Sequence, residues 1–176
     1  MYALTSEQMK QLDHYTIQQL GIAGPTLMEI AGNAVVMTCR EQQLLDGTIA
    51  VLCGSGNNGG DGFVIARRLM DLGYDVSIGL AVEAARIKGD ARVHYDVLMR
   101  RNIPVTFLKT EAQAQTFLSE TTTIIDCLLG TGISGQLRGT YAWLIPFINT
   151  LRKRVIAVDI PSGLNANDGT FDDAIY

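Results

Sequence analysis

The chain is poor in the residues that build metal sites and disulfides. It has three cysteines and two histidines among 176 residues, and no two cysteines are spaced as Cys-x-x-Cys. Cys39, Cys53 and Cys127 each stand among apolar neighbours, so we expect three free, buried thiols. A zinc site of the usual kind is therefore not expected, and the cysteine usage is typical of a reducing, cytoplasmic environment.

Long apolar runs and a dominant charge are also lacking. No apolar stretch reaches the ~18 residues of a membrane-spanning helix, and the first residues do not resemble a signal peptide. The net charge is −4, and the 14 basic residues are scattered rather than gathered on one face. We therefore expect neither a membrane nor a nucleic acid as partner. Only four prolines and a 47% hydrophobic content argue against disorder, and the length suits one domain.

The order of apolar segments predicts the fold class. Thr5 to Gln8 fits a capping box for a first helix, and Pro25 suits the first turn of a second one. After these two helices, over about residues 5–45, short apolar strands alternate with amphipathic helices across a core of about 48–176. This pattern predicts a Rossmann-like, doubly wound α/β fold: a mostly parallel sheet within three α/β/α layers. We expect strands at 48–53, 76–80, 105–108, 123–129 and 155–160, and later helices at 86–101, 111–118 and 141–151.

Three polar, glycine-rich segments follow predicted strands, at 54–62, 130–139 and 159–163. The carboxyl ends of parallel strands meet at one edge of the sheet, where ligands bind. Gly54-x-Gly56-x-x-Gly59 matches the dinucleotide fingerprint, a weak signal by itself. The acidic residue expected about 20 positions later, at the end of the second strand, is absent, and no Gly-Lys-Ser/Thr follows the glycines. A plain tight turn explains three glycines but not the interleaved Asn57, Asn58 and Asp61.

Two aspartates lie near the ends of predicted strands. Asp126 and Asp159 are each consistent with a turn-forming or capping residue, but their position beside glycine loops favours a binding site. Oxygen atoms of Asn58, Asp126 and the Ser162 region would suit a hard cation. Glu29 interrupts the apolar pattern of the second helix, and periodicity alone predicts that it lies on a solvated face.

The same segments resemble a known family, the NAD(P)H-hydrate epimerases of the YjeF N-terminal type. The similarity covers about Thr5 to Gly169 and is most specific in Asn-Asn-Gly-Gly-Asp-Gly at 57–62 and Asp-Ile-Pro-Ser-Gly at 159–163. Thr5-x-Glu-Gln-Met9 and Leu-Met-Glu-x-Ala-Gly at 27–32 are similar too. The resemblance implies an isomerase that interconverts the R and S epimers of hydrated NADH and NADPH, which are damaged cofactors. A dehydratase, separate or fused to the epimerase, would then restore the S epimer, and a homodimer is compatible with the resemblance.

The resemblance also implies roles for individual residues. Asp159 would contact the reacting ring and transfer the proton, while Asn58, Asp126 and Ser162 would bind one potassium ion per subunit. One positioned carboxyl that donates and then accepts a proton suffices for this chemistry, since the ring nitrogen expels the protonated hydroxyl. The implied substrate contacts, in addition to Asp159, are Asn57, Asn58, Gly59, Gly60, Asp61, Gly130, Thr131, Gly132, Ile133, Ser134, Gly135, Gln136 and Tyr141.

The sequence departs from the family pattern at two places. Ile30 occupies a position that is often polar, and the chain ends at Tyr176, before the family's usual final strands. An uncovered edge strand would follow from the second departure. These departures favour a second hypothesis, a catalytically silent dinucleotide-binding module. A third hypothesis, an ordinary NAD-dependent oxidoreductase, lacks both the ribose-binding acid and a Tyr-x-x-x-Lys pair.

Overall fold

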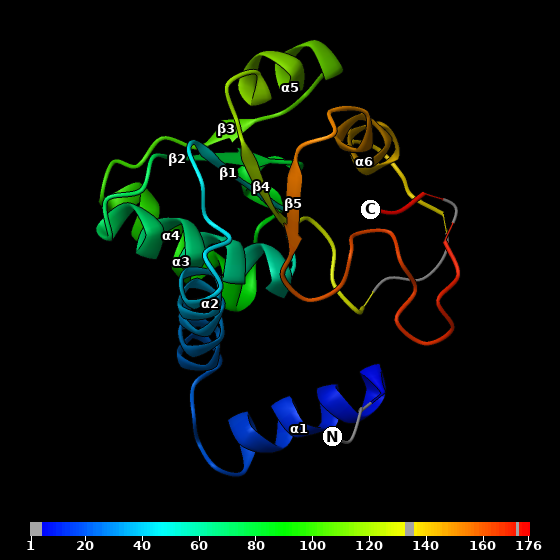
Figure 1. The fold of residues 1–176 in the computed structure, drawn as a ribbon. Helices are drawn as coiled ribbons and strands as arrows, with labels where there is room; N and C mark the ends of the chain where they lie inside the picture. Colours follow the sequence, from blue (N-terminus) through cyan, green and yellow to red (C-terminus); the bar gives the residue numbers. More distant parts are fainter. Residues whose placement is uncertain (1–4, 133–135, 172) are drawn as a thin grey trace.

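The computed structural model describes residues 5–132, 136–171 and 173–176, and its centre is a five-stranded parallel sheet. The strand order is β3-β2-β1-β4-β5 (Figure 1), so the chain winds outward from β1 in one direction and from β4 in the other. The predicted Rossmann-like, three-layer α/β/α architecture is confirmed. The strands are β1 (Ile49–Cys53), β2 (Val76–Leu80), β3 (Thr106–Phe107), β4 (Thr123–Cys127) and β5 (Arg154–Ala157).

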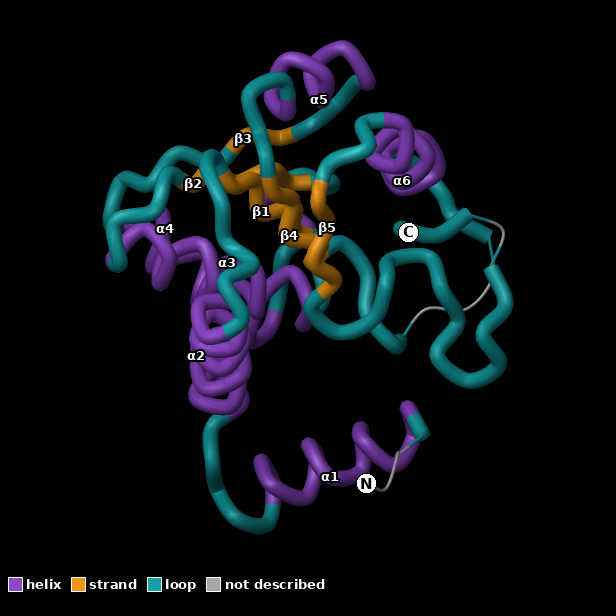
Figure 2. The backbone as a smooth tube through the Cα atoms, in the orientation of Figure 1, coloured by secondary structure: helices purple, strands orange, loops and turns teal. Residues whose placement is uncertain are grey.

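Helices cover both faces of the sheet (Figure 2). One face of β1, with Ile49, Val51 and Cys53, joins the apolar cluster of α3 and α4, whereas Ala50 and Leu52 join that of α5 and α6. Because both faces are covered, every residue of β1 is buried, as the continuous apolar run predicts. The helices are α1 (Ser6–Gln18), α2 (Gly24–Glu41), α3 (Asn57–Asp71), α4 (Gly89–Arg100), α5 (Glu111–Leu118) and α6 (Tyr141–Thr150), with a 3₁₀ turn at Ala84–Arg86.

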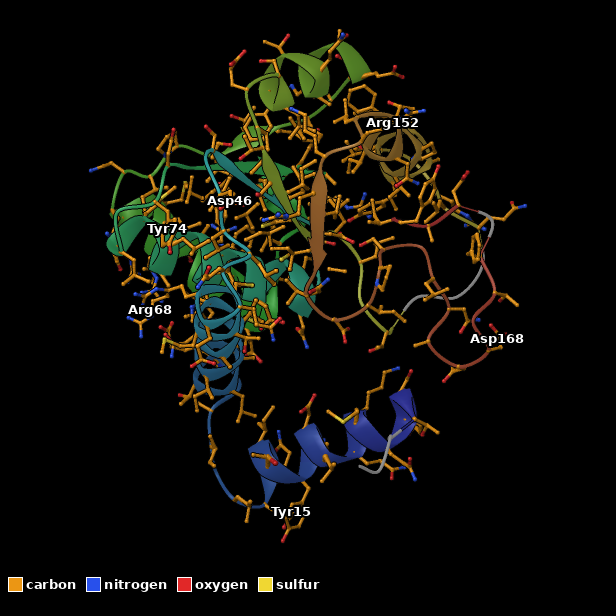
Figure 3. The ribbon with its side chains drawn as sticks, viewed as in Figure 1. Tyr15, Asp46, Arg68, Tyr74, Arg152 and Asp168 are labelled. Carbon is orange, nitrogen blue, oxygen red and sulfur yellow. The ribbon has the colours of Figure 1, made fainter. Side chains whose placement is uncertain are left out.

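The two N-terminal helices form as their start signals predict. The Thr5 hydroxyl accepts a hydrogen bond from the Gln8 N–H at 3.2 Å, and the Gln8 amide oxygen accepts one from the Thr5 N–H at 2.9 Å. Pro25 lies in the first turn of α2. α2 packs on α3, whereas α1 contains no buried residue and stands apart from the sheet, with Tyr15 pointing outward (Figure 3).

Three elements are shorter than the sequence predicts, each for a local reason. The helix expected from Arg86 starts only at Gly89, because residues 87 and 88 are extended. β4 ends at Cys127 because the next N–H, that of Leu128, bonds to the Asp126 carboxylate at 3.1 Å. β5 ends at Ala157: the Val158 N–H makes one more bond to the Asp126 carbonyl, at 3.2 Å, and the chain then bends toward Pro161.

The expectation for Glu29 is met only in part, since 34% of its side chain is exposed but its carboxylate pairs with charged groups of other helices. Its carboxylate pairs with the Arg67 guanidinium, lies 3.5 Å from Arg68 Nε and lies 3.7 Å from Nδ1 of the buried His94. Arg67 and Arg68 belong to α3 and His94 to α4, so this one side chain joins three helices (Figure 3 labels Arg68 beside α2). Its neighbour Ile30 is the residue that faces water, with 60% of its surface exposed.

The contact between α3 and the sheet depends on a missing side chain at Gly62. A Cβ atom there would lie 2.6 Å from Cys53 Sγ and 2.8 Å from Cys127 Cβ. Both cysteines are free and fully buried, as expected, and they fill the space that the glycine leaves. The first turns of α3 can therefore approach β1 and β4 closely.

We predict that Gly62→Ala destabilises the protein, measured as the free energy of unfolding in urea. Alanine favours a helix by ~1 kcal/mol, but overpacking costs ~1–3 kcal/mol and the short thiols cannot move far. Gly132→Ala is the control, since no atom of the described residues lies within 4 Å of its Cβ position. Equal stability of the two variants would show that the contact between α3 and the sheet tolerates a methyl group.

Candidate functional site

The candidate site lies where the strand order reverses, between β1 and β4. The loop after β1 leads into α3 on one face of the sheet, whereas the loop after β4 leads toward α6 on the other. A crevice at the carboxyl ends of the strands is the usual ligand position in such a sheet. Asn58, Asp126, Gly130 and Asp159 all belong to this edge.

A buried carboxylate joins two of the three loops. Asp126 is fully buried, and its carboxylate accepts hydrogen bonds from the Ser162 hydroxyl at 2.6 Å and the Ser162 N–H at 2.9 Å. The Ser162 oxygen in turn accepts the Leu129 N–H at 2.9 Å. Burial raises the pKa of Asp126 above its ordinary value, and the bonds from Ser162 and Leu128 oppose that rise. Asp126 is therefore a partner of the loop after β5 rather than a simple turn former.

Asn58 brings the third loop to the same point. Its amide nitrogen donates to the Leu129 carbonyl at 2.8 Å, and its side chain is buried at the start of α3. The amide oxygen Oδ1 is also buried, and among the described residues nothing donates to it. A buried acceptor of this kind carries a desolvation cost of ~1–3 kcal/mol unless a ligand or ion satisfies it. The structure thus gathers Asn58, Asp126 and Ser162 around Leu129.

Asp159 lies on the open side of this cluster. Its side chain is exposed, and Oδ2 accepts the Thr131 N–H at 2.9 Å. Gly130 makes the approach feasible, because a Cβ atom there would lie 2.5 Å from Asp159 Oδ2 and 3.3 Å from Asn58 Cβ. The carboxylate is therefore held at a fixed place and remains open to a substrate.

Asp61 is a second carboxyl in this region. It lies one helical turn after Asn58 and is partly buried. Burial, and to a lesser degree the negative charges of Asp159 and of Asp13, a residue of α1, together raise the pKa of Asp61 to about 7. The motif predicts Asp61 as a substrate contact, but its protonation at neutral pH depends on burial and on α1, which the sequence pattern does not reveal.

Tyr141 is placed at the same edge by α6. Burial raises the pKa of its phenol, and the backbone and hydroxyl of Ser55, in the loop after β1, oppose that rise. Gly54 leaves room for this contact, since a Cβ atom there would lie 3.0 Å from the Tyr141 hydroxyl. Tyr141 thus brings the start of α6 next to the glycine loop after β1.

The remaining predicted contacts fall into two groups. Asn57, Gly59 and Gly60 lie at the start of α3. The Gly60 N–H bonds to the Gly56 carbonyl at 3.1 Å, whereas the N–H groups before it are the ones that a helix start offers to an anionic ligand. Gly132 and Gln136 are exposed beyond Thr131. Ile133, Ser134 and Gly135 lie outside the described residues.

The described residues contain neither a cluster of acidic, histidine or cysteine metal ligands nor a membrane-spanning helix. Within 5–132, 136–171 and 173–176, no three His, Cys, Asp or Glu side chains form a group that could hold a metal ion. Any cation at this edge would therefore need amide, hydroxyl or carbonyl oxygens beside the single carboxylate of Asp126. No helix in the described part of the chain is long and apolar enough to cross a membrane.

We predict that Asp126→Ala lowers the free energy of unfolding by about 2–4 kcal/mol in urea titrations. The substitution leaves the buried Ser162 hydroxyl, the Ser162 N–H and the Leu128 N–H without their acceptor. Asp71→Ala is the matched control, because its exposed carboxylate also accepts two hydrogen bonds, both from Arg101. A surface pair of that kind contributes at most ~1 kcal/mol. Similar losses in both variants would contradict the role assigned to Asp126.

Sequence comparisons find relatives whose names refer to NAD(P)H-hydrate repair. It is 34% identical to an NAD(P)H-hydrate epimerase of Lentilactobacillus buchneri, over 95% of this chain and 75% of that protein. It is also 34% identical to one of Rhodopirellula baltica, over 94% and 67%. A bifunctional NAD(P)H-hydrate repair enzyme, Nnr, of Moorella thermoacetica is 35% identical over 96% of this chain, which spans only 33% of that relative.

Comparison with solved structures supports the same fold. The crystal structure of yeast ynu0, YNL200c, matches with a TM-score of 0.84 at 23% identity, over 99% of this chain and 77% of that one. The family described as YjeF-related protein N-terminus matches residues 24–175. The chain therefore belongs to the YjeF-related N-terminal family.

Proposed function

We propose that the chain is an isomerase that interconverts the R and S epimers of hydrated NADH and NADPH. The observation that carries the proposal is the convergence of Asn58, Asp126, Ser162 and Asp159 at the reversal point of the sheet. The relatives named NAD(P)H-hydrate epimerase, similar over 94–95% of this chain, support it. Function rests on this site rather than on the fold, which hosts many activities.

The arrangement suits the chemistry of a hydrated nicotinamide ring. The ring nitrogen can expel the C6 hydroxyl once that oxygen is protonated, which leaves a planar iminium that water attacks from either face. Asp159 is exposed and oriented by the Thr131 N–H, so it can exchange a proton at the ring. The first turn of α3 would bind the dinucleotide phosphates through the backbone N–H groups of Asn57 and Gly59.

We further propose that Asn58, Asp126 and Ser162 hold a potassium ion. The residues fit a hard monovalent cation, since they offer a buried, unsatisfied amide oxygen, a buried carboxylate and a hydroxyl. A bound cation would supply a fixed positive charge beside the substrate.

The functional partner proposed for the enzyme is a dehydratase that consumes the S epimer. The relatives named bifunctional repair enzymes support such a coupling.

We predict that Asp159→Asn lowers the rate of epimerisation by ~10²-fold or more, because the amide keeps the shape but cannot exchange a proton. The decay of the purified R epimer of hydrated NADH, followed with and without protein, measures the rate. Asp168→Asn, an exposed aspartate farther along the loop after β5, is the control and should keep full activity. If Asp159→Asn is as active as the wild type, Asp159 is not the proton donor. A wild-type protein that binds the epimers without interconverting them would be a silent binding module.

We also predict that potassium raises the melting temperature of the protein in a saturable way. A ligand that binds only the folded state stabilises it by RT ln(1 + [L]/Kd). Asn58→Ala should lose this increment, whereas Asn57→Ala, which alters the exposed neighbour on the same turn, should retain it. Equal responses to potassium, sodium and choline would indicate general screening and rule out the cation site.

A further inference from the structure

Helix α2 packs directly against the first turns of α3. The buried Met28 of α2 fills the space that Gly60 leaves, since a Cβ atom on Gly60 would lie 2.7 Å from Met28 Cε and 2.9 Å from Ala91 Cα of α4. One turn farther along α2, a Cβ atom on Gly32 would lie 3.1 Å from the Asp61 carbonyl oxygen. Because these contacts leave no free space, the position of the first turns of α3 depends on the position of α2.

Glu29, the residue after Met28, links α2 to both neighbouring helices. Its carboxylate pairs with Arg67 and lies 3.5 Å from Arg68 Nε, both on α3 (Figure 3 labels Arg68). It also lies 3.7 Å from Nδ1 of His94, on α4. Only 14% of the Arg67 side chain and 34% of that of Glu29 are exposed, so water screens this pair less than a fully exposed one.

His94 provides a second polar link to the same helix. Its ring is buried, and Nε2 donates to the Pro25 carbonyl at 2.9 Å, in the first turn of α2. Across the described ranges, every hydrogen bond or ion pair between α2 and its two neighbouring helices involves Glu29 or His94. The other contacts are apolar and therefore non-directional. Glu29 thus determines where α2 lies along α3.

We propose that Glu29 is a positioning residue for the ligand-binding turn at the start of α3. It fixes α2, and Met28 then holds Gly60 and the turn that carries Asn58. This inference rests on the proposed function, in which that turn binds the dinucleotide phosphates. Asp159 belongs to another loop and is oriented by the Thr131 N–H. Glu29 therefore affects substrate binding rather than proton transfer.

The far end of α3 offers a matched control. Asp71, the last residue of α3, pairs with Arg101 after the end of α4 at 2.6 Å. This pair also joins α3 to a neighbouring helix, but it lies at the opposite end of α3 from the ligand-binding turn. Asp71→Ala therefore removes an interhelical ion pair without touching the contact between α2 and Gly60.

The first test is amide hydrogen exchange, followed by NMR, which does not depend on activity. The Gly60 N–H bonds to the Gly56 carbonyl at 3.1 Å, and the Gly73 N–H, just after α3, bonds to the Met70 carbonyl at 3.0 Å. Glu29→Ala should accelerate exchange at Gly60 by ~10-fold and leave Gly73 unchanged. Asp71→Ala should do the reverse.

Two exchange results would overturn the proposal. Unchanged exchange at Gly60 in Glu29→Ala would show that the turn does not depend on Glu29. Equal acceleration at Gly60 and Gly73 would show a general loss of stability instead of local positioning. Glu29→Gln keeps an oxygen that can accept from Arg67, so it should show a smaller change at Gly60 in the same direction, and it replaces the alanine variant if that variant does not fold.

The second test separates KM from kcat for the purified R epimer of hydrated NADH. Glu29→Ala should raise KM by ~10-fold and keep kcat within about twofold, whereas Asp71→Ala should change neither. A lower kcat at unchanged KM would contradict a role in ligand binding. The expected exchange pattern in a protein without epimerase activity would overturn the proposed function, and the role of Glu29 in substrate binding with it.

Discussion

The hydrogen bonds between the Asp126 carboxylate and Ser162 hold the functional edge of the sheet together. They join residues 36 positions apart, the end of β4 and the loop after β5, and both residues are fully buried. The Ser162 oxygen then fixes the Leu129 N–H, and the Leu129 carbonyl receives Asn58. Each group in this series has its partner only if the previous bond is made. The position of Asp159, three residues before Ser162, depends on the same series.

Backbone proximity is the second requirement of the site. A Cβ atom on Gly54 would lie 1.9 Å from the Leu128 carbonyl oxygen, and one on Gly59 would lie 2.1 Å from the Gly54 carbonyl oxygen. Backbone atoms cannot move aside as a flexible side chain can. The loops after β1 and β4 therefore lie in direct contact, and the N–H groups at the start of α3 stay accessible to a ligand.

Local sequence patterns predict most of the fold. The limits of β2 and α5 agree with the structure, because apolar periodicity and a threonine cap determine them within a few residues. The motif segments also predict which residues meet at the sheet edge. Sequence patterns fail to predict a residue's environment or the end of a strand where a contact with a residue distant in sequence determines it. Glu29 is paired as well as partly exposed, since Arg67 and His94 reach it from other helices, and β4 ends early because the Asp126 carboxylate accepts the next N–H.

The ionisation of Asp61 shows the same limit for the site. Its motif predicts contact with substrate, whereas its pKa depends on the depth of α3 in the fold and on charges from residues 13 and 159. The approach of α1 to this region cannot be read from helical periodicity. The motif therefore predicts that Asp61 lies at the site, whereas its protonation state follows only from the three-dimensional structure.

The strand order has a consequence for how the chain folds during synthesis. β1 pairs with β4, whose first residue, Thr123, is made long after Cys53. At ~5–20 residues per second the ribosome needs roughly 4–14 s to span that interval. During this time the edge of β1 that later pairs with β4 is exposed to water or bound by a chaperone. Contacts so distant in sequence slow folding, so the nascent chain is most prone to aggregate before its fourth strand emerges.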